Sequence, residues 1–176
     1  MDQINRLILL VCFSILLCFG SIAICSPAAA VLRQHHENSG VLHYHAHSSL
    51  QDKRGMTWQV ILFPEYQADI VTKYHLRLVG FPGIAEFIHP QPLEIITAKG
   101  EIFNAADLNA VSSPAPNVGE FDLTSVLPIL PEKGSLKLST ILQNNDNLSL
   151  KIPESILIEW KLLAKEISSV ANILRD

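Results

Sequence analysis

The sequence predicts an α+β domain: an antiparallel sheet of about six or seven strands, built from hairpins, with a C-terminal amphipathic helix packed on one face. Three observations lead to this class. Apolar runs with alternating polarity, separated by turn residues, recur from Val41 onward. A rigid break, Gly-Phe-Pro-Gly and then His-Pro-Gln-Pro, divides two such runs within residues 74–94. The stretch that follows Pro153 changes from a strand period to a helical period.

The first 30 residues are expected to be a secretory signal and not part of the fold. Residues 7–24 form an uncharged apolar run after a short polar start. Ala28 and Ala30 supply the small residues that a signal peptidase requires, so cleavage is expected after Ala30. Residues 31–40 are then expected to be a mobile N-terminal segment, and residues 41–176 a single globular domain.

Two alternatives to a cleaved signal remain open. An uncleaved anchor would be the chain's contact with a membrane, since the apolar run is just long enough to cross a bilayer. A lipoprotein would be attached through Cys25, but Ile24 argues against it because a small residue is expected before such a cysteine.

Composition excludes several kinds of chemistry. All three cysteines lie in the expected signal, at Cys12, Cys18 and Cys25. The chain beyond the signal therefore has no disulfides, thiolate nucleophiles or cysteine metal ligands. The signal carries one acid and one base, Asp2 and Arg6, so the net charge of −4 survives its removal. No nucleic-acid partner is expected, because binding phosphates needs a basic face.

The first hairpin is predicted over Val41–Leu50 and Met56–Phe63, joined by the polar turn 51–55. Pro64 is expected to end the second strand, because proline cannot donate to a ladder. Alternation in the first strand puts three apolar residues on one side: Leu42, Tyr44 and Ala46. The other side carries three histidines: His43, His45 and His47.

The next strand is predicted over Thr72–Phe81 and ends in the rigid break. Two glycines, Gly80 and Gly83, flank Phe81 and Pro82, which is typical of a turn that needs one positive φ and one fixed φ. The His-Pro-Gln-Pro stretch then holds the backbone extended.

Two further hairpins follow. The strands of the first are predicted over Leu93–Ala98 and Glu101–Asn104, and those of the second on either side of Gln143–Asn147. Between the hairpins, residues 105–119 are expected to be a loop. Asp122 is then expected to cap a short helical piece that Pro128 stops.

The C-terminal helix shows one apolar seam with gaps of four and three residues: Ile156, Trp160, Leu163, Ile167, Val170 and Leu174. Its opposite face is predicted to carry Glu159, Lys161, Lys165 and Glu166. We expect the seam to dock on the sheet. The alternative, a helix that binds a partner or a second copy, remains open.

Four stretches carry a family resemblance: LRLVGFPG at 76–83, HPQPLEI at 89–95, PAPNVGEFDL at 114–123 and VLPILP at 126–131. Together they resemble an uncharacterised family of short exported cyanobacterial proteins, catalogued as a domain of unknown function. The resemblance implies an export signal followed by one domain, located in the thylakoid lumen or the periplasm. It implies no catalytic residues, and the histidine run is not part of the family pattern.

The histidine run is the candidate metal site. His43, His45 and His47 project from one face of a strand about 6.5–7 Å apart, so neighbouring pairs can reach one ion. Imidazole ligands suit zinc or copper. His35, His36, His75 and His89 could complete the site. The alternative is a solvated strand face, where histidine is an ordinary residue.

The rigid break is the candidate docking surface. Phe81, Pro82, Phe87 and Ile88 belong to one short apolar loop, together with Ile84. They either cover the end of the sheet or form an exposed patch that a partner binds.

Two functions therefore compete. The favoured one is a non-catalytic accessory or interaction protein of the lumen or periplasm that contacts a membrane or photosynthetic complex through its proline-stiffened loops. The alternative is a zinc or copper protein, or a metalloenzyme, that uses the histidine strand. Other catalysis is disfavoured, because no serine lies in a Gly-x-Ser-x-Gly setting and no carboxylate spacing selects an acid–base pair.

Overall fold

The computed structural model describes residues 32–36, 42–67, 70–109 and 115–173, and the side chains of those between 45 and 167. The expected signal, its cleavage site and the three cysteines lie outside these ranges. No helix in the described part of the chain is long and apolar enough to cross a membrane.

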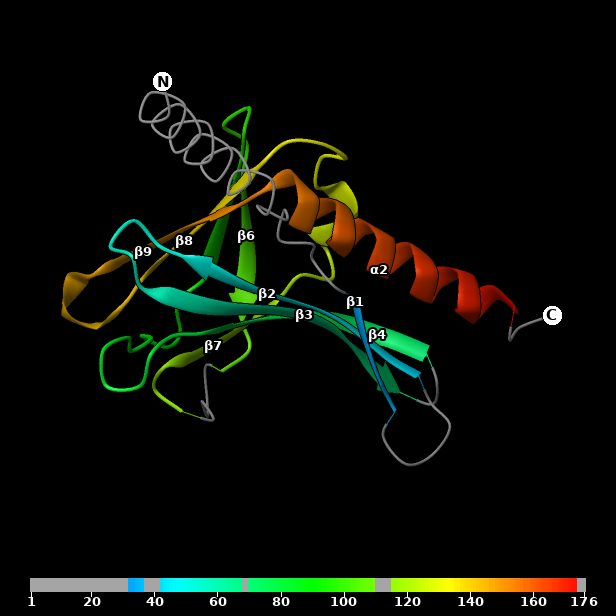
Figure 1. Cartoon of the computed structure of the whole chain (residues 1–176), viewed down its shortest axis with the longest axis horizontal. Helices are drawn as coiled ribbons and strands as arrows, with labels where there is room; N and C mark the ends of the chain where they lie inside the picture. Colours follow the sequence, from blue (N-terminus) through cyan, green and yellow to red (C-terminus); the bar gives the residue numbers. More distant parts are fainter. Residues whose placement is uncertain (1–31, 37–41, 68–69, 110–114, 174–176) are drawn as a thin grey trace, which may run out of the picture.

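The described strands form one antiparallel sheet in the order β1-β2-β3-β4-β7-β6-β5-β8-β9 (Figure 1). Their bounds are β1 Leu32–His36, β2 Leu42–Gln51, β3 Thr57–Gln67, β4 Ile70–Val79, β5 Leu93–Thr97, β6 Ile102–Asp107, β7 Val118–Asp122, β8 Leu136–Ile141 and β9 Asn147–Ile152. One long helix, α2, spans Glu154–Ile173. The predicted α+β class is confirmed, with more strands than the six or seven expected.

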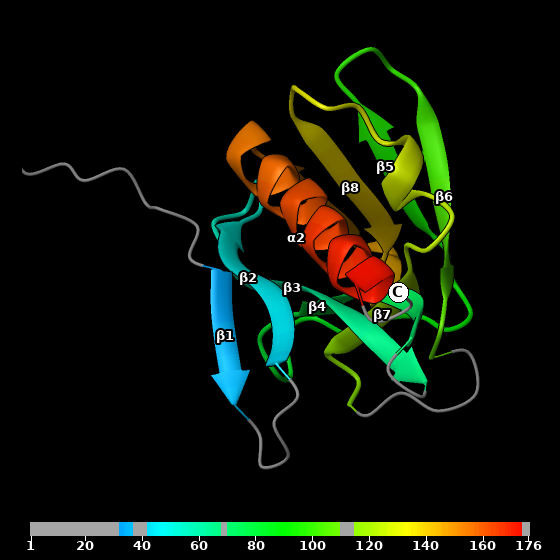
Figure 2. The same ribbon diagram turned by 90° about the vertical axis from the view of Figure 1, so that its right-hand side faces the viewer.

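The sheet bends at β6. The first part of this strand pairs with β5, and its last two residues, Ala106 and Asp107, pair with β7. One strand therefore joins the two halves of the sheet. Figure 2 shows α2 lying across the face between these halves.

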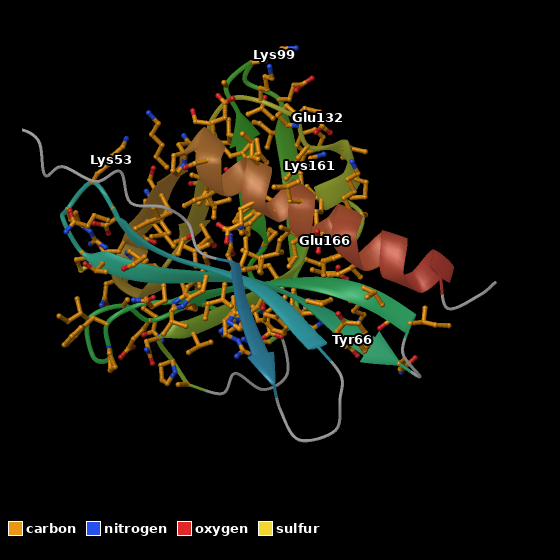
Figure 3. All side chains as sticks on the ribbon, turned by 45° about the vertical axis from the view of Figure 1, so that its right-hand side comes forward. Lys53, Tyr66, Lys99, Glu132, Lys161 and Glu166 are labelled. Atoms are coloured by element: carbon orange, nitrogen blue, oxygen red, sulfur yellow. The ribbon has the colours of Figure 1, made fainter. Side chains whose placement is uncertain are left out.

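The core lies between this face and α2. Strands alternate, so the inward positions of β3 and β4 bury Trp58, Val60, Leu62, Leu76 and Leu78. The helix contributes Ile156, Leu157, Trp160, Leu163 and Ile167. Lys161 Nζ contacts Glu132 Oε1 at 3.3 Å and ties the helix to the loop before β8 (Figure 3). The prediction that the apolar seam packs within the domain is therefore confirmed for its described part.

Pro64 does not end its strand as predicted. β3 continues to Gln67, and Pro64 pairs with Tyr74 of β4. The pairing of β3 with β2 stops at Leu62. Beyond that point β3 has β4 as its described neighbour, so the missing N–H of Pro64 interrupts no ladder on the other side.

Two strands lie where regular structure was not expected. Leu32–His36, within the segment predicted to be mobile, pairs with β2 as β1. Val118–Asp122, at the end of the predicted loop and beyond it, forms β7 between β4 and β6. After β7, Asp122 Oδ1 accepts the Thr124 N–H at 2.8 Å, and a short 3-10 helix, η2, spans Leu127–Ile129. Pro128 was predicted to stop the short helical piece. It lies inside η2 instead, because proline is compatible with a first helical turn.

The polar face predicted for α2 is wrong at Glu159, which is 7% exposed. Glu159 lies three residues after Ile156 and four before Leu163, a spacing that places it on the buried side of a helix. Neither carboxylate oxygen has a hydrogen-bond partner in the described structure, and burial raises the pKa of this side chain.

Candidate functional site

The histidine strand is only partly described. His45 and His47 are half-buried, and the side chain of His43 lies outside the described set. His47 Nε2 lies 2.5 Å from Gln59 Oε1 on β3. Among the described residues, no group of three or more His, Cys, Asp or Glu side chains is arranged to hold a metal ion. The metal site at His43, His45 and His47 stays a prediction.

His75, which could have completed that site, belongs to a charged network on the outer face of the sheet. Its Nδ1 lies 2.6 Å from Glu120 Oε1, and its Nε2 lies 2.8 Å from Glu65 Oε2. Arg77 Nε donates to the second oxygen of Glu120 at 2.9 Å, and its guanidinium lies over the Phe63 ring. The network therefore links β3, β4 and β7.

The rigid break forms the loop of residues 80–92, between β4 and β5, and begins with a turn. Ile84 N–H donates to Phe81 O at 3.2 Å, and Gly83 has a φ of 74°. Proline and then a glycine with positive φ at the two central positions define a type II turn. The predicted turn with one fixed φ and one positive φ is therefore confirmed.

Gly80 serves a different purpose from the one predicted. Its φ is not positive, and a Cβ here would lie 2.5 Å from Ala85 Cβ and 2.8 Å from the Trp58 ring. Glycine is required because the loop packs directly on the core. Two hydrogen bonds hold the same point: Gly80 N–H donates to Asn117 O, and Asn117 Nδ2 donates to Gly80 O, each at 2.9 Å.

Phe87, one of the predicted docking residues, is a core residue and is 4% exposed. Its ring meets Trp58 edge-on at 5.9 Å and Phe121 at 6.2 Å between centroids. The ring occupies the space left by Gly119, where a Cβ would lie 2.6 Å from it. Its N–H donates to Pro116 O at 2.8 Å. Phe87 therefore anchors the loop and cannot contact a partner.

The second half of the loop is held by Asp107, whose side chain is 3% exposed. Asp107 Oδ2 accepts from His89 Nδ1 at 2.6 Å and from the Gln91 N–H at 3.0 Å. Its Oδ1 accepts the Asn109 N–H at 2.9 Å. His89 Nε2 is buried without a partner in the described structure, as is Asn109 Nδ2. The end of β6 is thereby fastened to the loop.

The other apolar residues of the loop point outward. Phe81 is 65% exposed, Ile84 is 61% exposed and Ile88 is 39% exposed, while Pro82 is also exposed. We call these four residues the apolar loop patch. Of the predicted docking residues, Phe81, Pro82 and Ile88 belong to it. Ile84, which the sequence had placed in the same cluster, belongs to it as well.

Sequence reasoning missed the residues that hold the loop. Asp107, Asn117 and Gly119 were all assigned to the predicted loop 105–119, and none of them was expected to hold loop 80–92. The signal for Gly119 was present: Gly119 and Phe121 alternate with Val118 and Glu120, which is the pattern of a strand with one glycine at an inward position.

A family model described as "Protein of unknown function (DUF3122)" matches residues 30–163. The chain belongs to the DUF3122 family. The match spans all described strands of the DUF3122 domain, loop 80–92 and the first half of α2. No curated protein and no solved structure matches the chain. The four stretches that carried the family resemblance all lie inside the matched region.

Proposed function

We propose that the protein is a non-catalytic accessory or interaction protein of an exported compartment, the thylakoid lumen or the periplasm. We further propose that the apolar loop patch is its docking surface. The observation that carries the proposal is the contrast within loop 80–92: its inward side chains are fixed in the core, while Phe81 and Ile84 are each more than half exposed.

Rigidity supports docking over a purely structural role. Binding through a mobile loop costs the conformational entropy of every side chain and backbone unit that becomes ordered. Here the backbone is held by Asn117 at its start, by Pro116 at Phe87 and by Asp107 at its end. Gln143 N–H also donates to Glu86 O at 2.8 Å. The exposed side chains therefore lie on a prearranged surface.

The chemistry of the patch selects the partner class. Phe81, Pro82, Ile84 and Ile88 carry no charge or hydrogen-bonding side chain, so they suit an apolar pocket on another protein. A membrane-associated or photosynthetic protein complex of the same compartment is the partner that the family resemblance suggests. Phe81 is the expected central anchor, because aromatic residues are enriched among the residues that dominate binding energy.

The test is co-purification in gentle detergent from cells that make the protein with Phe81→Ser and Ile84→Ser together. The matched control is Ile102→Ser, because Ile102 on β6 is 60% exposed, close to the 61% of Ile84. Loss of two anchors is expected to weaken association with the complex at least tenfold, while the control retains it. All variants should unfold at the same temperature, since the changed side chains are exposed.

Two outcomes would overturn the proposal. One is equal association of the double variant and the wild type. The other is binding to lipid vesicles without any protein partner, lost in the double variant, which would assign the patch to a membrane surface.

A further inference from the structure

A second surface feature lies away from the apolar loop patch. It is a groove of about 460 Å³ between the β2–β3 turn and the strands β5, β8 and β9. The turn contributes Gln51, Asp52 and Lys53, and Figure 3 shows Lys53 projecting from it. Arg54 Nη1 donates to Asp146 Oδ2 at 2.6 Å, which fixes the turn beside the β8–β9 connection. The two walls of the groove are therefore held together.

The groove carries uncompensated positive charge. Lys137 and Lys151 are directly opposite each other on β8 and β9, and both are exposed. Lys53, on the turn, lines the same groove. None of the three forms an ion pair with a described residue. Like charges directly opposite on neighbouring strands destabilise a sheet, so this pair costs folding energy in a chain of net charge −4.

The acid in the lining does not neutralise these lysines. Asp52 has a side chain that is 3% exposed, and its oxygens accept from the N–H groups of Arg54 and Met56 and from Trp58 Nε1. Its carboxylate is directed into the turn and is fully used there. An anion from outside the chain would therefore be the counter-charge for Lys53, Lys137 and Lys151.

Most of the open surface of the groove is apolar, although Gln51, Thr97, Ser135 and Ser149 also line it. The side chains of Ile96 and Ala98 line it, together with the stems of the lysines, which cover apolar surface while their ammonium groups reach solvent. A groove of this volume is within the range of small-molecule sites. An inorganic anion would leave these aliphatic groups in contact with water, whereas a ligand with an apolar body would cover them.

We propose that this groove binds a small amphiphilic anion, in which a phosphate or carboxylate is joined to an apolar body. The ammonium groups of Lys137 and Lys151 contact the anionic head, and Lys53 closes over it from the β2–β3 turn. The apolar body lies along Ile96 and Ala98. The site is separate from loop 80–92, so it stands whether or not that loop docks a partner.

The test is calorimetric titration of the protein, as purified from cells, with three probes: octyl phosphate, octyl glucoside and inorganic phosphate. Octyl phosphate is expected to bind with a single stoichiometric site, and at least tenfold more tightly than either other probe. Octanoate, titrated in parallel, distinguishes a carboxylate head from a phosphate head. Binding should weaken as salt is raised, because the head is held by exposed charges.

Lys137→Gln combined with Lys151→Gln should weaken octyl phosphate binding at least tenfold. The change removes a like-charge pair, so the unfolding temperature should stay the same or rise. Lys53→Gln is a second variant outside the sheet and should weaken binding severalfold. Lys73→Gln is the matched control, since Lys73 on β4 also lacks an ion pair with a described residue and lies outside the groove. Equal binding of octyl glucoside and octyl phosphate, or unchanged binding in the double variant, would overturn the proposal.

Discussion

Glu159 allows a sharp test of how the helix packs. The residue is 7% exposed, both carboxylate oxygens are buried without partners in the described structure, and Trp160 and Leu163 are buried on the same side of α2. Burial raises the pKa of Glu159 above its ordinary value of 4.5, because the charged form is deprived of water. A raised pKa means that the folded state favours the neutral acid. Stability is then highest below the unfolded pKa and falls as pH rises through the folded pKa.

The change to make is Glu159→Gln, which keeps the shape and removes the charge. An unsatisfied buried polar group costs about 1–3 kcal/mol, and more when it is charged. We therefore expect the variant to be more stable than wild type at pH 8 by about 1–3 kcal/mol. For a chain of this size, each kcal/mol corresponds to a rise of about 2–4 °C in unfolding temperature. Near pH 4 the two proteins should unfold at nearly the same temperature.

The assay is thermal unfolding across pH 4 to 8, followed by near-ultraviolet circular dichroism of the buried tryptophans. Glu94→Gln is the control, because Glu94 on β5 is exposed and should change stability by less than about 0.5 kcal/mol. A Gln variant that is less stable than wild type at pH 8 would refute the reasoning. It would mean that the carboxylate has a stabilising partner, such as a bound cation.

Two further predictions concern the turns and the loop. Burial acts to raise the pKa of Asp52, but hydrogen bonds from Met56 N–H, the Trp58 indole and Arg54 N–H, with the Arg54 charge, hold it below 3.8. Asp52→Asn should therefore lower the free energy of unfolding by about 1–3 kcal/mol at pH 7. Urea unfolding should show that this difference vanishes as pH falls below the folded pKa of Asp52. A difference that stays constant with pH would contradict the prediction. Gly119→Ala should cost about 1–3 kcal/mol, because the added methyl overlaps the Phe87 ring. Hydrogen exchange should then quicken at the Phe87 amide, and unchanged protection there would show that the ring has another place to pack.

The fold class was predictable because its signals are local. Alternation in β2 and β3, the Asp52–Gly55 turn and the helical spacing after Pro153 each need only a few neighbouring residues. Strand β7 was missed because one of its two inward positions is a glycine, which carries no apolar signal. Glu159 was misplaced for a different reason. Its spacing from Ile156 and Leu163 indicated the buried face, whereas its charge indicated an exposed position. The prediction followed the charge, and the spacing was correct.

The candidate site was predictable only in part. The type II turn at Pro82 and Gly83 follows from residue types alone. Residue types do not show which aromatic side chain of the loop turns inward. The inward position of Phe87 depends on the space that Gly119 leaves on β7. The anchoring of His89 by Asp107 likewise joins positions far apart in the chain. Such pairings exist only once the strand order β4-β7-β6-β5 is known.

The proposed docking function requires that Phe81 faces a partner in the living cell. The deciding measurement is photo-crosslinking with a benzophenone amino acid at position 81, which keeps an aromatic side chain there, and at position 102 as the control. Both native residues are well exposed, at 65% for Phe81 and 60% for Ile102. If Phe81 docks a partner, position 81 should give one discrete protein adduct and position 102 should give none. No adduct from position 81, or the same adducts from both positions, would contradict the proposed docking function.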